Sequence, residues 1–162
     1  WEADQDLNSA MQNSVNWYFQ AIDSQLGINR VQEFLNKIEY GNQTTSSNLD
    51  LYWSDFSLKI SPLEQVTLLK KFNTNEFHLN SQNVFSVKNA IKIASTPNGN
   101  FYGKTGTGRV NGQDINGWFI GYVETSDNSY YFATNIQSDS NATGKKAFEI
   151  TSDILKKLHI WN

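Results

Sequence analysis

The sequence predicts a mixed α/β (α+β) fold in which an antiparallel sheet is flanked by helices. Hydrophobic residues recur at helical spacing through the first half of the chain. Three short runs rich in aromatic and β-branched residues, separated by turn signals, follow in the second half, and a last helical pattern closes the chain. Segregated helices, a meander and a final helix are typical of an antiparallel sheet covered by helices.

Two helical patterns open the chain. The first lies within residues 4–13, and the second runs over residues 14–26 and ends at Gly27, with Ser14 as a candidate N-cap. A third helix is expected to start at a capping Asn29 and to stop at Gly41-Asn42. Its inward side chains are expected to be Val31, Phe34, Leu35 and Ile38. Residues 42–50 are polar and predict a surface loop.

Two more helices are predicted before the sheet. Ser61-Pro62-Leu63-Glu64 is a strong helix start, because Ser61 can cap, Pro62 suits the first turn and Glu64 can close a capping box. The next helix is expected from about Ser81 to Ile91. Pro97-Asn98-Gly99 then predicts a turn.

The predicted strands cover residues 101–110, 117–125 and 129–137. Asn111-Gly112 and residues 126–128 separate them, which predicts an antiparallel meander. The closing helix is expected over residues 143–158 and to pack on the sheet. Its apolar face is predicted to consist of Ala147, Ile150, Ile154, Leu155 and Leu158.

Composition narrows the function. The 162 residues are 38% hydrophobic and 14% aromatic, which suits one domain, or a large part of one, with a packed core. A net charge of −3 without a basic patch argues against a nucleic-acid partner. The chain has no cysteine, and its two histidines lack metal-ligand spacing, so we expect no metal and no other cofactor. No apolar run approaches the roughly 18 residues of a spanning helix, so membrane attachment would need segments outside this chain.

The stretch from Gly103 to Gly108 combines a cation, two hydroxyls and three glycines. Glycines let a ligand approach the main chain, while Lys and Thr side chains can hold an anion. A phosphate-binding P-loop would need glycine at position 98, but the residue there is Asn98. It would also need a helix directly after the motif, but two glycines and the Asn111-Gly112 turn signal follow, so a P-loop is not supported. We therefore predict an anion-recognition edge strand that lines an active-site cleft.

Two further segments carry polar groups at suggestive positions. Ser14 and Asn16 offer a hydroxyl and an amide at a helix start, although Ser14 could simply cap the helix. Trp53 could shield a polar group or fill the core. No histidine-centred triad is visible, so a chymotrypsin-type hydrolase is not supported.

Taken in order, these features resemble the serine penicillin-recognising proteins, and within them the class D β-lactamase branch. The resemblance implies the serine β-lactamase and penicillin-binding-protein fold, with residues 1–162 as the C-terminal portion of a single penicillin-binding domain. The matching segments are Ser14-Val15-Asn16 as the second motif, Tyr40-Gly41-Asn42, Tyr52-Trp53, Ser57 to Val66, Lys104-Thr105-Gly106 as the third motif, and Gly117 to Glu124.

Within this family the chain is most similar to the extracellular sensor domain of BlaR/MecR-type antibiotic receptors, and Asn16 is the discriminating residue. The class D enzymes usually carry Val or Ile there. An apolar residue keeps the site of the catalytic carbamylated lysine dry, whereas an amide favours carbamate loss. Water is then not activated and the acyl-enzyme persists. The resemblance therefore favours a sensor over a β-lactamase.

The resemblance also implies roles. Lys104, Thr105 and Thr107 would bind the β-lactam carboxylate, and the Thr107 N–H would be one oxyanion donor. Ser14 would relay a proton to the leaving nitrogen, and Asn16 would contact the catalytic lysine and the ligand amide. The substrate-binding residues are expected to be Trp53, Thr105, Gly106 and Trp118, beside the catalytic Ser14, Asn16, Lys104 and Thr107.

One family element is missing, because no Ser-x-x-Lys motif occurs in these 162 residues. The family places it before the second motif, so the chain is expected to begin downstream of it and to form no acyl-enzyme by itself. Three functions stay open: a β-lactam sensor that signals across a bacterial membrane from its extracellular face, a class D β-lactamase, and a noncatalytic interaction domain. The alternative location is that the protein is secreted. A β-lactam is the expected partner, and the oligomeric state is not predicted.

Overall fold

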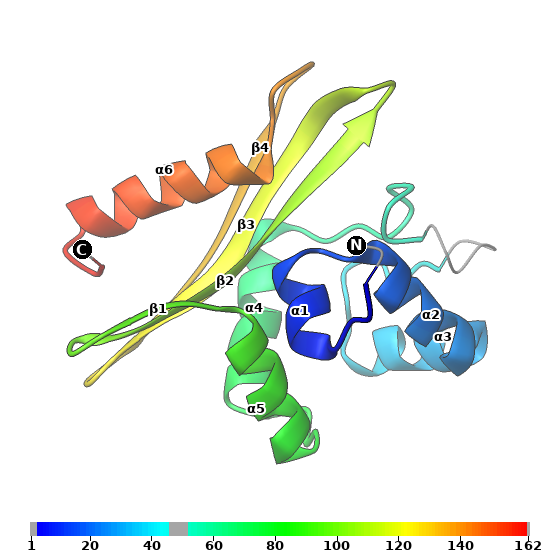
Figure 1. Cartoon of the computed structure of the whole chain (residues 1–162), viewed down its shortest axis with the longest axis horizontal. Helices are drawn as coiled ribbons and strands as arrows, with labels where there is room; N and C mark the ends of the chain where they lie inside the picture. Colours follow the sequence, from blue (N-terminus) through cyan, green and yellow to red (C-terminus); the bar gives the residue numbers. More distant parts are fainter. Residues whose placement is uncertain (1–2, 46–51, 162) are drawn as a thin grey trace. The chain divides into compact units, whose positions relative to one another are not determined.

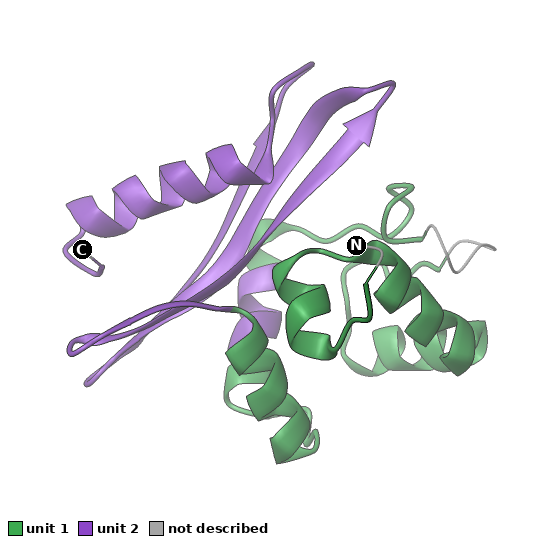
Figure 2. Ribbon diagram, viewed as in Figure 1, with its two compact units in different colours: residues 1–64, 71–91 green, residues 65–70, 92–162 purple. Residues whose placement is uncertain are grey.

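The computed structural model describes residues 3–45 and 52–161 of the chain (Figure 1). The chain divides into two compact units, one formed by residues 1–64 and 71–91 and the other by residues 65–70 and 92–162 (Figure 2). Helices make up the first unit, and the sheet with its helix makes up most of the second. Each unit is described by itself.

Unit 1 is helical. Helix α1 packs against α5, and α2 contacts α3. Helix α4 begins and ends in unit 1, while its residues 65–70 belong to unit 2. The bounds are α1 Leu7–Gln12, α2 Asn16–Leu26, α3 Ile28–Lys37, α4 Pro62–Asn73 and α5 Ser81–Ala90.

Side-chain caps fix where three of these helices begin. The Asp6 carboxylate accepts from the Ser9 N–H at 2.7 Å, which caps α1. The predicted box at α4 is confirmed, because Ser61 N–H donates to Glu64 Oε2 at 2.8 Å and Glu64 N–H donates to Ser61 Oγ at 3.3 Å. Asn80 caps α5, since its side-chain oxygen accepts from the Gln82 and Asn83 N–H groups. Each cap satisfies N–H donors that the helix itself leaves open.

Three expectations for α2 and α3 are wrong. Ser14 does not cap α2, because the capping position is Val15 and no side chain bonds there. Asn29 lies inside α3, which starts directly after Gly27 and ends at Lys37, before the predicted stop. Phe34 is 45% exposed, whereas Val31 and Leu35 are buried. The inward stripe of this short helix is thus narrower than the sequence pattern suggested.

A small apolar cluster holds the chain that follows α3. Val31, Leu35 and Tyr52 form its buried part. Tyr40, Trp53 and Leu58 pack against it. The predicted loop at residues 42–50 is described as far as residue 45, where no helix or strand forms, and residues 46–50 lie outside the described residues.

The sheet of unit 2 has four antiparallel strands in the order β1-β2-β3-β4. The bounds are β1 Lys92–Thr96, β2 Gly99–Val110, β3 Gln113–Thr125 and β4 Ser129–Gln137. The predicted fold class and meander are confirmed. Strand β1 was not predicted, because it is short and mostly exposed, so it shows no clear hydrophobic alternation.

The hairpin turns follow the sequence signals. Asn111 and Gly112 both have positive φ, at 48° and 78°, as a two-residue turn of type I′ requires. Strand β3 therefore starts at Gln113, four residues before the predicted start at Gly117. Strand β4 has the predicted bounds.

Helix α6 (Gly144–Lys157) covers one face of this sheet, as Figure 1 shows. Thr143 caps it, since its hydroxyl accepts from the Lys146 N–H at 3.2 Å. The predicted apolar face is wrong in part, because the buried residues of α6 are Gly144, Ala147, Thr151 and Leu155. Ile150, Ile154 and Leu158 are exposed, so α6 packs on the sheet mainly through its small residues.

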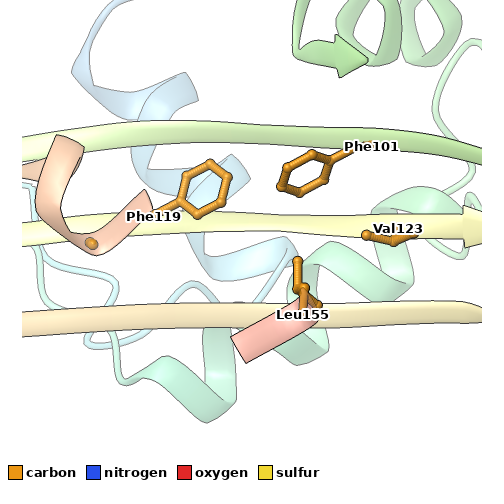
Figure 3. Close-up of a cluster of buried hydrophobic side chains, with 5 residues drawn as sticks. Phe101, Phe119, Val123 and Leu155 are labelled. Atoms are coloured by element: carbon orange, nitrogen blue, oxygen red, sulfur yellow. The ribbon is translucent and has the colours of Figure 1, made fainter. Parts of the chain in front are cut away.

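Phenyl rings fill the layer between α6 and the sheet. Phe101, Phe119 and Val123 come from the strands and Leu155 from α6, as labelled in Figure 3. The Phe101 and Phe119 rings meet edge to face with centroids 6.0 Å apart. Burial of such aromatic side chains contributes most to the stability of a core of this kind.

Candidate functional site

The residues of the third motif lie on an open part of β2. Strand β1 pairs with β2 only over Gly99–Tyr102, so from Gly103 onward that edge of β2 has no strand partner among the described residues. The opposite edge pairs with β3 along its whole length. Within unit 2, β2 is therefore an edge strand only from Gly103 onward, and the anion-recognition role stays a prediction.

The strand pleat divides the motif between two faces. Thr105 and Thr107 lie on the face that α6 covers, since Thr105 is opposite the buried Phe119 and Thr107 bonds to the first residue of α6. Lys104 lies on the other face, because side chains alternate along a strand. The two hydroxyls and the ammonium therefore project from opposite faces of β2 beside its open edge.

Lys104 is half-buried, and its ammonium donates to the Thr105 carbonyl at 3.1 Å. Burial lowers the pKa of this ammonium from the ordinary lysine value of 10.5. The desolvated cation loses some of its water shell, which strengthens its attraction to an anion.

Gly106 and Trp118 are paired across β2 and β3. A Cβ built on Gly106 would lie 3.8 Å from the Trp118 Cβ, an ordinary contact distance. Trp118 is half-buried and shares its sheet face with Lys104. This arrangement lets the indole form part of an apolar wall beside the cation.

The second motif lies in unit 1, where α1 passes into α2. Ser14 has φ of 51°, and its N–H donates to the Met11 carbonyl at 3.3 Å. Val15 is fully buried and its N–H bonds to the Ala10 carbonyl at 2.9 Å, while Ser14 and Asn16 on either side are exposed. The turn thus presents a hydroxyl and an amide around one buried anchor.

A positive φ is uncommon for serine and is often found at functional positions. Nine non-glycine residues of the described chain share this feature, so it does not single out Ser14. The structure does remove the alternative that Ser14 is a helix cap.

Trp53 packs in the cluster around Val31 and Leu35 and is half-buried. This position supports the core interpretation of its ring. The predicted site residues therefore fall into two groups, with Ser14, Asn16 and Trp53 in unit 1 and Lys104, Thr105, Gly106, Thr107 and Trp118 in unit 2.

Sequence reasoning missed two glycines beside the third motif, Gly117 and Gly144. A Cβ on Gly144 would lie 2.6 Å from the Gly106 carbonyl oxygen, and one on Gly117 would lie 2.6 Å from the Thr143 carbonyl carbon. No local sequence signal marks them, because their need for glycine comes from chain segments that meet only in the fold.

The described residues lack two kinds of functional feature. No group of three or more His, Cys, Asp or Glu side chains in the described ranges is placed to hold a metal ion. None of the helices in the described part of the chain is long and apolar enough to cross a membrane.

The family model described as "Penicillin binding protein transpeptidase domain" matches residues 1–156. Among curated proteins, the chain is 48% identical over 161 residues to "Regulatory protein BlaR1" of Bacillus licheniformis and 44% identical over 160 residues to "Methicillin resistance mecR1 protein" of Staphylococcus aureus. Each match covers 99% of this chain and 27% of the relative, so the chain spans about a quarter of their length.

Solved structures agree with this assignment. The C-terminal domain of the Bacillus licheniformis BlaR penicillin receptor matches with a TM-score of 0.95 and 47% identity, over 100% of this chain and 65% of that one. A class D β-lactamase from Bacillus subtilis matches with a TM-score of 0.91 and 38% identity, over 100% of this chain and 66% of that one. The resemblance that the motifs indicated is confirmed, and the chain belongs to the penicillin binding protein transpeptidase domain family.

Proposed function

We propose that this chain forms part of a β-lactam sensor domain of a membrane receptor, which is acylated by penicillins and signals the induction of resistance. The observation that carries the proposal is the match of 99% of the chain to BlaR1 and MecR1 at 48% and 44% identity. In this proposal residues 1–162 are the C-terminal portion of a single penicillin-binding domain on the extracellular face of a bacterial membrane.

The third motif is proposed to hold the ligand's acid group. A β-lactam at the open edge of β2 would receive hydrogen bonds from the Thr105 and Thr107 hydroxyls and a charge-assisted bond from Lys104. The Thr107 backbone N–H would donate to the developing oxyanion, which typically contributes about 3 kcal/mol to catalysis. Gly106 gives the ligand access to the main chain, and Trp118 is proposed to provide an apolar contact.

The second motif is proposed to govern proton transfer and adduct lifetime. Ser14 would pass a proton to the leaving nitrogen. Asn16 would contact the catalytic lysine of the Ser-x-x-Lys motif and, by favouring the uncharged amine over its carbamate, deprive water of a base. Trp53 would pack near that lysine. The exposed amide of Asn16 at the start of α2 supports such a role.

A second candidate function is β-lactam hydrolysis. The match to a class D β-lactamase at 38% identity and a TM-score of 0.91 favours it. The two functions share acylation and differ in deacylation, which is slow in a sensor and fast in an enzyme.

One experiment separates the candidates. It uses the extended domain, which is this chain preceded by a segment that carries the Ser-x-x-Lys motif. We expect fluorescent penicillin to label this protein stably, with nitrocefin turnover no faster than in the variant whose nucleophilic serine is replaced by alanine. Rapid nitrocefin turnover would establish a β-lactamase, and absence of labelling would establish a noncatalytic interaction domain.

A further inference from the structure

We propose that the first turn of α6 positions the ligand-binding hydroxyl of Thr107, and that Gly144 is the positioning residue. The inference rests on the proposed function, because the hydroxyl matters only if a β-lactam acid group binds at the edge of β2. It adds a determinant of specificity outside the three sequence motifs.

The first observation is how closely α6 approaches the motif. A Cβ on Gly144 would lie 2.6 Å from the oxygen and 2.9 Å from the nitrogen of Gly106, and 2.9 Å from the Thr105 Cβ. Two of these three atoms belong to the backbone and cannot swing aside. Gly144 has helical backbone geometry, so glycine is needed here for space and not for a left-handed conformation.

A second glycine, on the neighbouring strand β3, also leaves room for the first turn of α6. A Cβ on Gly117 of β3 would lie 2.6 Å from the Thr143 carbonyl carbon and 2.9 Å from Ile136 Cγ1. Residue 117 is paired with Thr107 across β2 and β3. The turn at residues 143–144 therefore rests directly on the backbones of both strands beside Thr107.

The third observation is the hydrogen bond between the two segments. The Gly144 N–H donates to Thr107 Oγ1 at 2.9 Å, and the two residues are 37 positions apart. A hydroxyl has one proton to donate and two lone pairs to accept with. Since Gly144 uses a lone pair, it fixes the side-chain rotamer and leaves the proton available for a ligand carboxylate. The accepted bond also polarises the hydroxyl and makes it a stronger donor.

The turn is itself held in place from other directions. The Ala142 N–H donates to the Asp114 carbonyl of β3 at 2.8 Å. Further along, the Thr134 hydroxyl of β4 lies 2.7 Å from the Thr151 hydroxyl of α6. Because β2 has no strand partner on its outer edge at Thr107 among the described residues, this anchored turn is the rigid element that can set the position of the hydroxyl.

The test compares an acid ligand with its ester in the extended domain. Benzylpenicillin carries the carboxylate, and its methyl ester lacks the charge. For Gly144→Ala we expect acylation to slow with both ligands, because the added Cβ presses on the Gly106–Thr107 peptide unit that carries the oxyanion donor. We expect the rate constant to fall about tenfold further with benzylpenicillin than with the methyl ester, the effect of losing roughly one well-placed hydrogen bond. The acid-to-ester ratio is the readout, because a general loss of stability would lower both rates alike.

Two matched controls separate positioning from folding. Lys145→Ala changes the next residue of the same turn, whose side chain is exposed, and should leave the ratio unchanged. Thr134→Val loosens α6 at its second anchor, away from Thr107, and should lower the melting temperature without changing the ratio. If Gly144→Ala does not fold, Thr143→Ala replaces it, because it removes the side-chain cap of the same turn, and Thr143→Ser is its control. We expect alanine but not serine at position 143 to lower the ratio.

The outcomes distinguish the inference from the function on which it rests. A parent domain that penicillin does not label overturns the proposed function and this inference with it. A labelled parent whose ratio is the same in Gly144→Ala as in Lys145→Ala, or the same in Thr143→Ala as in Thr143→Ser, overturns the inference alone. A ratio that falls only in Gly144→Ala, or only in Thr143→Ala where the second pair is used, supports it.

Discussion

The Ser14–Asn16 turn and the Lys104–Thr107 segment are held by different kinds of contact. Backbone bonds to Met11 and to Ala10, within five residues, place the turn. Strand pairing with β3 and the contact with α6 place the segment, and the contact with α6 includes a hydrogen bond between residues 37 positions apart. A site residue that is held by local hydrogen bonds can be substituted with little loss of stability. A residue that is held by packing between distant segments cannot be changed without destabilising its unit.

The largest effect should come from adding a side chain on β3, where the strand packs tightly against β2 beside the third motif. A Cβ on Gly121 would lie 2.7 Å from Phe132 Cζ and 2.8 Å from the Gly103 Cα. We expect Gly121→Ala to lower the free energy of unfolding by about 3 kcal/mol, measured by chemical denaturation. Gly106→Ala is the matched control, since its Cβ has room, and its unfolding should change far less. Equal effects of the two substitutions would show that the strands are not packed as described.

The second effect concerns the cation. We expect Lys104→Met to lower the rate constant for acylation of the extended domain by benzylpenicillin about a hundredfold, since a hydrogen bond to a charged group contributes roughly 1.5–3 kcal/mol. Lys145→Met, at an exposed position on α6, is the control. An acylation rate that depends no more on Lys104 than on Lys145 would remove the third motif from ligand binding.

The third effect should fall on the locally held turn. In the extended domain, Asn16→Val is expected to shorten the lifetime of the penicillin adduct about tenfold, because the lysine carbamate becomes favoured and can act as a general base. The adduct is followed by mass spectrometry after excess drug is removed. Stability should change little, since the Asn16 side chain is exposed. An unchanged lifetime would refute the carbamate argument.

The fourth effect is a pH dependence of unit 2. Burial, and then the nearby Glu124 carboxylate, raise the pKa of Tyr102 from 10.0 to about 12. The folded state therefore keeps this phenol protonated where the unfolded state ionises, so its stabilising contribution is full below pH 10 and is lost as the pH rises toward 12. Denaturation at a series of pH values should show this loss, and Tyr102→Phe should reduce it. An identical pH slope in both proteins would contradict the assignment.

The smallest effect should come from a local cap. Ser61→Ala removes one half of the capping box of α4 and is expected to cost about 1 kcal/mol of unfolding free energy. Ser61→Thr keeps a capping hydroxyl and should lose less. If Ser61→Ala lowered the free energy of unfolding as much as Gly121→Ala does, local contacts and contacts between distant segments would contribute equally to stability. That result would contradict the comparison of the two regions.

Local signals in the sequence were sufficient for much of the fold. The Asn111-Gly112 turn, the capping box at Ser61 and the aromatic and β-branched strand at residues 129–137 are encoded within a few residues, and all three are present. The predicted start of α2 was wrong for lack of such a signal. Ser14 was a plausible cap, but the buried Val15 occupies the capping position.

Packing over long sequence distances was beyond the reach of pattern reasoning. The apolar Ile150 and Ile154 are exposed, while the small Gly144 and Ala147 face the sheet, because close approach to β2 and β3 selects small residues. The third motif could be placed on a strand from its sequence. Which of the two faces α6 covers could not be predicted, because that depends on contacts between segments far apart in the sequence.

A crystal structure of the extended domain acylated by benzylpenicillin gives the most direct test. We expect the ligand carboxylate at the open edge of β2, about 2.7–2.9 Å from the Lys104 ammonium or a similar distance from the Thr105 and Thr107 hydroxyls. The Gly144 N–H should still donate to Thr107. A carboxylate held entirely by residues outside β2, with the Thr107 hydroxyl facing away from the ligand, would contradict the proposed recognition.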